Sequence, residues 1–360
     1  SNAPKVIASL TSALGDCVHD IGAPTAKNQT ISIKKDEQNI YKNSRVQLES
    51  WWSSTSYQIQ ALRDNPQCAA EELKTIANNK DPGLSPHFNF KTNVKTYTRR
   101  PKVAIFREQG VNGQVEMAAA FHWAGFESVD VHLNDIANGR VTLDDFSVLA
   151  ACGGFSYGDV LGAGGGWAKS ILCNDNLREA FKTFFARKDT LSFGVCNGCQ
   201  MLSNLKEIIP GSAHWPVFKK NTSEQFEARL VSVKVNKSPS AFFTGMEGSI
   251  IPIVVSHGEG RAVFNDAKSS QQALQSNLAP LQYVDNYGNV TEAYPFNPNG
   301  SPAGITSLTS VDGRSTILMP HPERGFLTQQ YSWHPSAWDD NGPWLKLFQN
   351  ARQWVEENNA

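Results

Sequence analysis

The sequence predicts an α/β protein with an open, mostly parallel sheet flanked by helices and a small N-terminal extension. Three observations support this prediction: short, continuously apolar runs alternate with helical stretches after residue 100, glycine-rich loops follow two of those runs, and the composition differs before residue 100. Strands that are apolar at every position are buried on both faces, as in a parallel sheet covered by helices.

The extension comes first in the chain. We expect a short strand and turn within 31–37, a helix over 46–62 interrupted by the serines at 53 and 54, and a second helix over 69–78 that a D-P-G sequence ends. Residues 84–100 are typical of an extended linker. Residues 1–3 are typical of the remnant of a cleaved tag, so we expect the chain to be a piece of a longer protein.

Strands and helices alternate after residue 100. The predicted strands are 103–106, 129–132, 148–151 and 191–195, and the predicted helices are 115–124 and 177–185, with another at 200–205. Further strands are expected at 230–235, 250–255 and 315–319, and a final helix at 344–354. In sheets of this kind, reactive groups collect where the parallel strands end.

Composition narrows the class of function. Hydrophobic residues make up 40% of the chain and charged residues 19%, which is typical of a folded protein. A net charge of −1 argues against nucleic acid or an anionic membrane as a partner. No apolar run is long enough to cross a bilayer. Six irregularly spaced cysteines do not form a disulfide framework, so we expect the protein in a reducing cytoplasm.

The strand expected at 191–195 leads into a loop of the form G-x-C-x-G centred on Cys196. This is the pattern of a nucleophile elbow with cysteine in place of serine, in which the glycines permit a tight turn and the thiol projects from it. The start of the following helix favours the thiolate, which is the attacking form. A buried structural cysteine is the alternative, and the two glycines argue against it.

Two other patterns suggest different chemistry. Cys196 and Cys199 form a C-x-x-C pair, but a zinc site needs a second pair, which neither Cys152 nor Cys173 supplies. A redox role is disfavoured because Cys199, one helical turn further on, is expected to face the core. The glycine-rich run 162–170 is not a phosphate loop, since alanine occupies two positions where that motif requires glycine.

A cysteine nucleophile needs a base, and the base needs a group that orients it. Among eight histidines, His321 follows an apolar strand and has Glu323 two residues on, in a segment stiffened by prolines. In an extended segment, residues i and i+2 point to the same side, so Glu323 can hold the His321 ring. We assign His257 to the pocket wall or an inter-domain face rather than to the chemistry.

Attack on an amide also needs donors for the developing oxyanion. Gly153 and Gly154 follow the strand expected at 148–151 and can present backbone N–H groups toward the neighbouring cysteine loop. The N–H of Asn197 is a third candidate. No metal ligand is predicted.

Four segments together resemble class I glutamine amidotransferases, and more narrowly the glutaminase domains of the phosphoribosylformylglycinamidine synthase family. They are R-E-Q-G-V-N at 107–112, G-G-F-S-Y-G-D at 153–159, G-V-C-N-G-C-Q at 194–200 and P-H-P-E-R at 320–324. The resemblance implies a flavodoxin-like glutaminase domain over 99–360. It also implies that 4–50 are the tail of a synthetase domain and 51–98 a connector.

The resemblance further implies a mechanism. Cys196 would attack the side-chain amide of glutamine, His321 would carry the proton to the leaving ammonia, and Glu323 would orient His321. Water would hydrolyse the thioester, and the ammonia would reach a synthetase site where ATP and Mg²⁺ drive amidation of formylglycinamide ribonucleotide in purine biosynthesis. As glutamine-binding residues we would look to Arg107, Asn112, Gln200 and Phe226, the last within 221–229.

The same resemblance sets the expected partners. They are glutamine and the synthetase domain of the same polypeptide, in a monomer, with no cofactor in this chain. By itself the chain should be a weak or uncoupled glutaminase. Two alternatives stay open: a cysteine peptidase or small-molecule amidase of the same superfamily, and a non-catalytic interaction module.

Overall fold

The computed structural model describes residues 2–23, 29–92 and 97–358. The chain divides into two compact units, one formed by Ser1–Gln58 and Leu73–Asn79 and the other by Ile59–Glu72 and Lys80–Ala360. Two helices, α2 (Arg45–Arg63) and α3 (Pro66–Thr75), contribute residues to both units. Among the described residues, no helix is long and apolar enough to cross a membrane.

The first unit contains the helix α1 (Ala3–Leu14) and an antiparallel hairpin of β1 (Thr30–Lys35) and β2 (Gln38–Ser44). The predicted strand and turn are confirmed, and the turn has Asp36 and Glu37 in the left-handed region. The predicted interruption of the next helix is wrong: α2 continues through both serines. The Ser54 hydroxyl donates to the carbonyl of Trp51 over 2.7 Å, so it is satisfied within the helix.

Within the described part of the second unit, six strands form one sheet in the order β12-β13-β6-β5-β3-β4. Neighbouring strands are parallel except for β12 and β13. The strands are β3 (Lys102–Arg107), β4 (Glu127–His132), β5 (Val148–Ala151), β6 (Leu191–Val195), β12 (Ser307–Thr309) and β13 (Ser315–Leu318). The predicted open, mostly parallel sheet is therefore confirmed.

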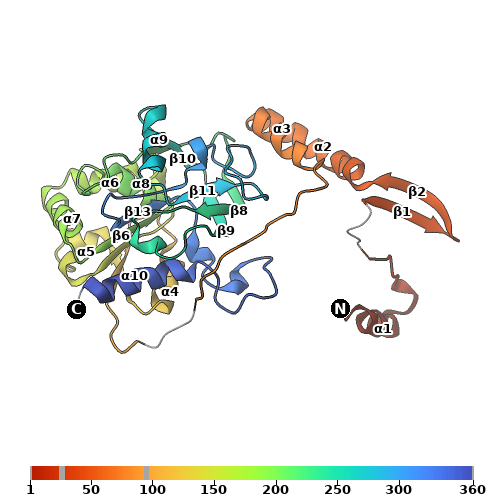
Figure 1. Cartoon of the computed structure of the whole chain (residues 1–360), viewed down its shortest axis with the longest axis horizontal. Coiled ribbons are helices and arrows are strands. Elements are labelled where there is room, and N and C mark those ends of the chain that lie inside the picture. Colours follow the sequence, from red (N-terminus) through yellow and green to blue (C-terminus); the bar gives the residue numbers. More distant parts are fainter. Residues whose placement is uncertain (1, 24–28, 93–96, 359–360) are drawn as a thin grey trace. The chain divides into compact units, whose positions relative to one another are not determined.

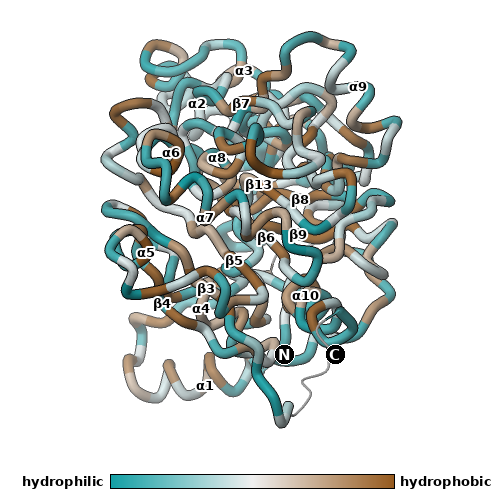
Figure 2. The backbone as a smooth tube through the Cα atoms, turned by 90° about the vertical axis from the view of Figure 1, so that its left-hand side faces the viewer, coloured by the Kyte–Doolittle hydropathy of each residue, from teal (hydrophilic) through white to brown (hydrophobic). Residues whose placement is uncertain are grey.

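Helices cover both faces of this sheet (Figure 1). They are α4 (Gln114–Trp123), α5 (Leu133–Ala137), α6 (Gly165–Leu172), α7 (Asp175–Ala186), α8 (Asn197–Asn204) and α10 (Leu345–Asn358). On one face, Phe121 of α4 and Phe348 of α10 pack edge-on, 5.0 Å apart, beside Phe193 of β6. On the other, Trp167 of α6 and Phe181 of α7 pack on Phe106 of β3. The strands of the sheet are largely hydrophobic, and the loops around them are largely hydrophilic (Figure 2).

A second layer contains two smaller antiparallel sheets. One has the order β11-β8-β9 and the other pairs β10 with β7. The strands are β7 (Val217–Lys219), β8 (Glu227–Val235), β9 (Ile250–His257), β10 (Arg261–Val263) and β11 (Leu281–Val284), with the helix α9 (Ala267–Gln275). The strand β9 pairs with β8, and its Val254 also bridges to His321 beyond β13. The second layer is thereby connected to the end of the parallel sheet where the candidate site lies. Residues 84–92 and 97–100 of the expected linker contain no helix, while 93–96 lie outside the described residues.

Candidate active site

Cys196 lies on a sharp turn between β6 and α8. Its backbone has φ 53° and ψ −111°, an unfavourable conformation for a side chain with a Cβ, as expected of a nucleophile elbow. The turn is held on both sides, because the N–H of Cys196 donates to the carbonyl of Leu318 and its carbonyl accepts from the N–H of Gln200, each over 3.0 Å. These two hydrogen bonds, one to the end of β13 and one within α8, therefore hold the backbone of Cys196 in its strained conformation.

The two glycines of the elbow are required by close packing. A Cβ on Gly198 would lie 2.1 Å from the carbonyl oxygen of Ala151, and a Cβ on Gly194 would lie 2.8 Å from the carbonyl oxygen of Gly198. Cys196 itself is 6% exposed, with its Sγ 3.6 Å from the carbonyl oxygen of Ser256. The thiol therefore lies at the start of α8 and is largely buried.

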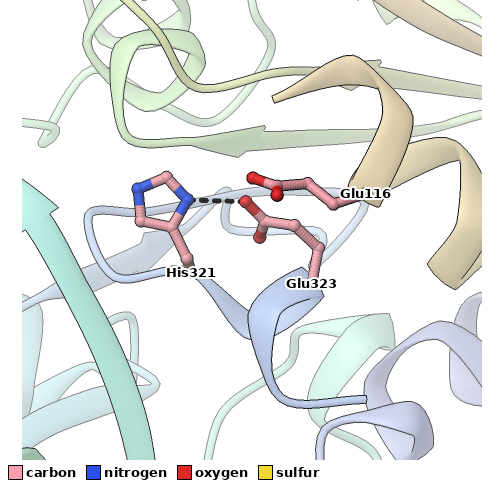
Figure 3. A group of neighbouring side chains, drawn as sticks. All are labelled: Glu116, His321 and Glu323. Atoms are coloured by element: carbon pink, nitrogen blue, oxygen red, sulfur yellow. Dashed lines mark hydrogen bonds and ion pairs between the residues drawn. The ribbon is translucent and has the colours of Figure 1, made fainter. Parts of the chain in front are cut away.

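His321 and Glu323 form a buried pair. His321 Nδ1 lies 2.6 Å from Glu323 Oε1, and the two residues are 2% and 0% exposed (Figure 3). The backbone N–H of His321 donates to the carbonyl of Val254 over 2.8 Å. The expectation of an extended segment is wrong, because Pro322–Arg324 form a 3-10 turn with His321 as its N-cap. The turn still brings the carboxylate to the ring.

The protonation state of His321 depends on its neighbours Glu323 and Cys196. Burial by itself lowers the pKa of His321, but the Glu323 carboxylate and the Cys196 sulfur outweigh it and raise the pKa to about 10. Because Nδ1 is taken by Glu323, Nε2 is the ring nitrogen that remains for Cys196, and it has no hydrogen-bond partner among the described residues. The raised pKa favours a protonated His321 ring beside Cys196.

His257 lies at the end of β9 and is 2% exposed. Burial and the neighbouring His321 lower the pKa of His257 to about 3, so its ring is neutral. Its Nε2 is 3.3 Å from the amide nitrogen of Asn299. His257 is therefore a neighbour of His321, and its assignment to the pocket wall or an inter-domain face stays a prediction.

The predicted oxyanion residues lie beside Cys196. A Cβ on Gly153 would be 2.8 Å from His321 Cε1 and 3.2 Å from Cys196 Cβ, so Gly153 is in contact with both. The Gly153 carbonyl is turned away, since it accepts from the N–H groups of Asn112 and Gly113. Gly154 continues this loop at φ 151°.

Asn197 ties the cysteine loop to the next loop along the sheet edge. Its side-chain oxygen accepts from the Ser156 hydroxyl over 2.6 Å, and its amide nitrogen donates to Asp159 Oδ1 over 2.8 Å. Burial raises the pKa of Asp159, an effect that the bond from Asn197 opposes. The Asn197 side chain is therefore structural, and its backbone N–H, in the first turn of α8, is the group free to serve an oxyanion.

The predicted glutamine-binding residues are more dispersed. Arg107 makes a two-point ion pair with Asp130, at 2.6 and 2.9 Å. Gln200 is 3% exposed and donates to the carbonyl of Glu259, while Asn112 is exposed and joins the Gly153 loop through its backbone. Phe226 is half exposed, and its ring lies 6.1 Å from that of Phe155, which follows Gly154. Of these four residues, Asn112 and Phe226 are therefore the ones placed beside the Gly153–Gly154 loop.

Sequence reasoning missed two charged side chains at this site. Glu116, in the first turn of α4, accepts from Arg324 Nε over 2.7 Å. Ligand atoms of Glu116, His321 and Glu323 all lie within 4.8 Å of one another, a grouping that could in principle hold a metal ion (Figure 3). The pairings His321–Glu323 and Glu116–Arg324 already engage these groups, so the cluster is a hydrogen-bonded charge network.

The other cysteines do not support zinc or dithiol chemistry. Cys199 is fully buried, as expected, and burial raises the pKa of its thiol well above the ordinary value. Burial does the same to Cys152. All six cysteines are free thiols.

With this geometry defined, residues 100–355 match the model of a protein family described as the CobB/CobQ-like glutamine amidotransferase domain. The chain belongs to this family. The description places the second unit among enzymes that take an amide nitrogen from glutamine, and the cysteine elbow lies inside the matched range.

Several solved structures are similar to this chain, and the first of those below shares its fold. A chain of PurLQS from Thermotoga maritima is 24% identical, with a TM-score of 0.53, over 71% of this chain and 100% of that one. A glutamine amidotransferase from Thermotoga maritima is 14% identical, with a TM-score of 0.36, covering 63% and 78%. The glutaminase domain of Trypanosoma brucei CTPS, with bound acivicin, is 12% identical, with a TM-score of 0.40, covering 72% and 95%.

Proposed function

We propose that the chain is the glutaminase part of a phosphoribosylformylglycinamidine synthase, and that Cys196, His321 and Glu323 carry out the reaction. The observation that supports this most is the buried His321–Glu323 pair beside a strained cysteine elbow, in a chain of the glutamine amidotransferase family. The narrower assignment rests on the four sequence segments at 107–112, 153–159, 194–200 and 320–324. Similarity to PurLQS adds the fold alone.

The proposed chemistry proceeds in two steps. In the first, the Cys196 thiolate forms a bond to the side-chain carbonyl carbon of glutamine, the carbon–nitrogen bond breaks, and His321 gives its Nε2 proton to the leaving ammonia. Glu323 holds Nδ1, so Nε2 stays aimed at the reacting centre. In the second, water attacks the thioester while His321 accepts the proton of the water, the carbon–sulfur bond breaks, and the step releases glutamate and restores the Cys196 thiolate and the protonated His321. Backbone N–H groups of Gly154 and Asn197 are the proposed donors to the oxyanion in both steps.

The burial of the site favours a small amide over a polypeptide. Cys196 and His321 are 6% and 2% exposed, so an extended peptide would need the surrounding loops to open, whereas the end of a glutamine side chain is small enough to enter. Exposed aromatic side chains of Phe155 and Phe226 flank the approach and are proposed to contact the substrate. Asn112 is a second proposed contact. The side chains of Arg107 and Gln200 are held by Asp130 and by the Glu259 carbonyl, so a role in glutamine binding would require them to leave these partners.

The ammonia would be used by a synthetase domain that binds ATP and Mg²⁺ and amidates formylglycinamide ribonucleotide. Because free ammonia is protonated at neutral pH and then cannot act as a nucleophile, direct transfer to such a domain is part of the proposal. The protein would work in a reducing compartment, the cytoplasm, in keeping with its six free thiols.

A covalent labelling experiment tests the proposed nucleophile. The chain is incubated with acivicin, digested, and analysed by mass spectrometry, with glutamine as the competing ligand. We expect a single adduct on Cys196 that glutamine suppresses and that Cys196→Ala abolishes. The matched control is Cys173→Ala, which removes an exposed thiol and should leave labelling intact. Adducts on other thiols, unaffected by glutamine, would contradict the proposal.

A further inference from the structure

A second ion pair lies directly beside the His321–Glu323 pair. Glu116 and Arg324 come from α4 and from the turn after β13, 208 positions apart in the chain, and meet at 2.7 Å. Figure 3 shows the Glu116 carboxylate beside the Glu323 carboxylate, and both lie on the same side of the His321 ring. Atoms of Glu116, His321 and Glu323 lie within 4.8 Å of one another. The Glu116 carboxylate, itself paired with Arg324, therefore lies beside the His321–Glu323 pair.

The two carboxylates differ in their access to water. Glu323 is 0% exposed, and its Oε2 has no hydrogen-bond partner among the described residues, whereas the side chains of Glu116 and Arg324 are 33% and 29% exposed. Two carboxylates this close repel each other unless a cation is present. Arg324 supplies that cation, and the first turn of α4 favours a carboxylate at Glu116.

Other groups face the same centre from the neighbouring elements. They are Cys196 at the start of α8, Cys152 after β5 and His257 at the end of β9. Cys152 is a neutral thiol, because burial raises its pKa well above the usual range, and His257 is a neutral ring. The more distant Arg107 and Asp130 are paired with each other. Among the described residues, Glu116 and Arg324 are thus a charged pair beside the proposed triad.

We propose that the Glu116–Arg324 ion pair is a positioning pair that sets the pH range in which the Cys196–His321 pair stays ionised. The inference rests on the proposed function and extends it to two residues that do not touch the reacting atoms. Glu116 stabilises the imidazolium and Arg324 destabilises it, so the balance between them determines how wide that range is.

The two members of the pair act with opposite signs. A thiolate–imidazolium pair exists between two apparent ionisations that belong to the pair as a whole, and these form the two limbs of a bell-shaped pH profile. Removing the negative charge of Glu116 leaves Arg324 unbalanced and destabilises the imidazolium, so the alkaline limb, where His321 loses its proton, moves to lower pH. Removing the positive charge of Arg324 leaves Glu116 unbalanced, and the alkaline limb moves to higher pH. If Glu116 and Arg324 only stabilised the fold, the two variants would not shift this limb in opposite directions.

The experiment measures kcat/KM for glutamine against pH in four variants of the chain. Glu116→Gln should move the alkaline limb to lower pH and Arg324→Gln should move it to higher pH, by about half to one pH unit given their partial exposure. The double variant should return the alkaline limb to its native position. Asp175→Asn is the matched control, since Asp175 is also a first-turn carboxylate paired with an arginine, Arg178, but on α7. It should leave the profile unchanged.

Several results would overturn the inference: limbs that stay in place in both single variants, limbs that move in the same direction in both, or a double variant that behaves as the sum of two losses. If either variant unfolds, Glu116→Asp and Arg324→Lys keep the charges, and they should retain the native limbs even where kcat falls. A native profile that shifts on adding a chelator would mean that Glu116, His321 and Glu323 bind a cation, which also contradicts the proposal.

Failure of the underlying function is distinguishable from failure of this inference. If the chain is not a glutaminase, the native protein hydrolyses no glutamine and shows no bell-shaped pH profile, and Cys196→Ala has no activity to remove. If the chain is a glutaminase and only the positioning role is wrong, the native bell is present and its limbs do not respond with opposite signs to the two single variants.

Discussion

Gly153→Ala is the substitution that the geometry of the site opposes most clearly. The new methyl group would lie 2.8 Å from His321 Cε1 and 3.2 Å from Cys196 Cβ. The first distance is about 0.7 Å short of a normal carbon–carbon contact of about 3.5 Å. The Gly153 backbone cannot easily retreat, because its carbonyl accepts from both Asn112 and Gly113. The imidazole ring must therefore move, away from the cysteine.

The size of the effect follows from that displacement. A misplacement of about 1 Å costs catalysis roughly 100-fold, so a shift of about 0.7 Å should lower kcat by about 10- to 100-fold. Overpacking of the pocket should also lower the free energy of unfolding by about 1–3 kcal/mol. KM should change less than kcat, because the methyl group points at the catalytic side chains and the exposed aromatic residues are untouched.

Both kcat and KM are obtained from the rate of glutamate release at a series of glutamine concentrations. The control is Gly165→Ala at the start of α6, where the added Cβ would meet only Leu161 Cβ at 3.9 Å, an ordinary contact. That variant should retain kcat within about twofold. A Gly153→Ala protein that is folded and has native kcat and KM would refute the placement of Gly153 between the two catalytic side chains.

Three further predictions concern the neighbouring residues. Glu323→Gln removes the carboxylate that helps raise the pKa of His321 to about 10, so kcat should fall by about 100- to 1,000-fold and the alkaline limb should move to lower pH, as a pH series would measure. His257→Gln should flatten the acid dependence of stability. In the unfolded chain His257 becomes protonated below about pH 6.5, whereas in the folded chain it becomes protonated only near pH 3. The free energy of unfolding of the native protein therefore falls as the pH drops between those values. Urea titrations from pH 7 to 4 measure this slope. Cys199→Ala should keep glutaminase activity within about threefold, with or without reductant; a strict requirement for that thiol would restore the redox interpretation.

The parallel sheet was predictable because its strands are apolar at every position and lie between turns. The expected strands at 148–151 and 191–195 agree with β5 and β6 to the residue. The helix α6 was missed because it begins inside a glycine run, where propensity favours a loop. The interruption expected within α2 failed because a serine hydroxyl can bond to a carbonyl of its own helix.

The candidate site likewise has parts that could be predicted from the sequence and parts that could not. Cys196 and the His321–Glu323 pair are local patterns, readable from two or three neighbouring residues, and the structure brings them together. Glu116 could not be predicted, because its contact with Arg324 spans 208 positions and depends on how α4 packs against the turn after β13. The anchoring of His321 by the Val254 carbonyl was hidden for the same reason, since a backbone contact leaves no trace in side-chain identity.

Trapping the acyl-enzyme tests the central claim most directly. The chain is mixed with glutamine, quenched in acid within the first turnovers, and analysed by intact-protein and peptide mass spectrometry. We predict a γ-glutamyl group on Cys196 that disappears on treatment with hydroxylamine and is absent from Cys196→Ala. Glutamate production by the native chain without any acyl group on Cys196, or continued turnover by Cys196→Ala, would contradict the account.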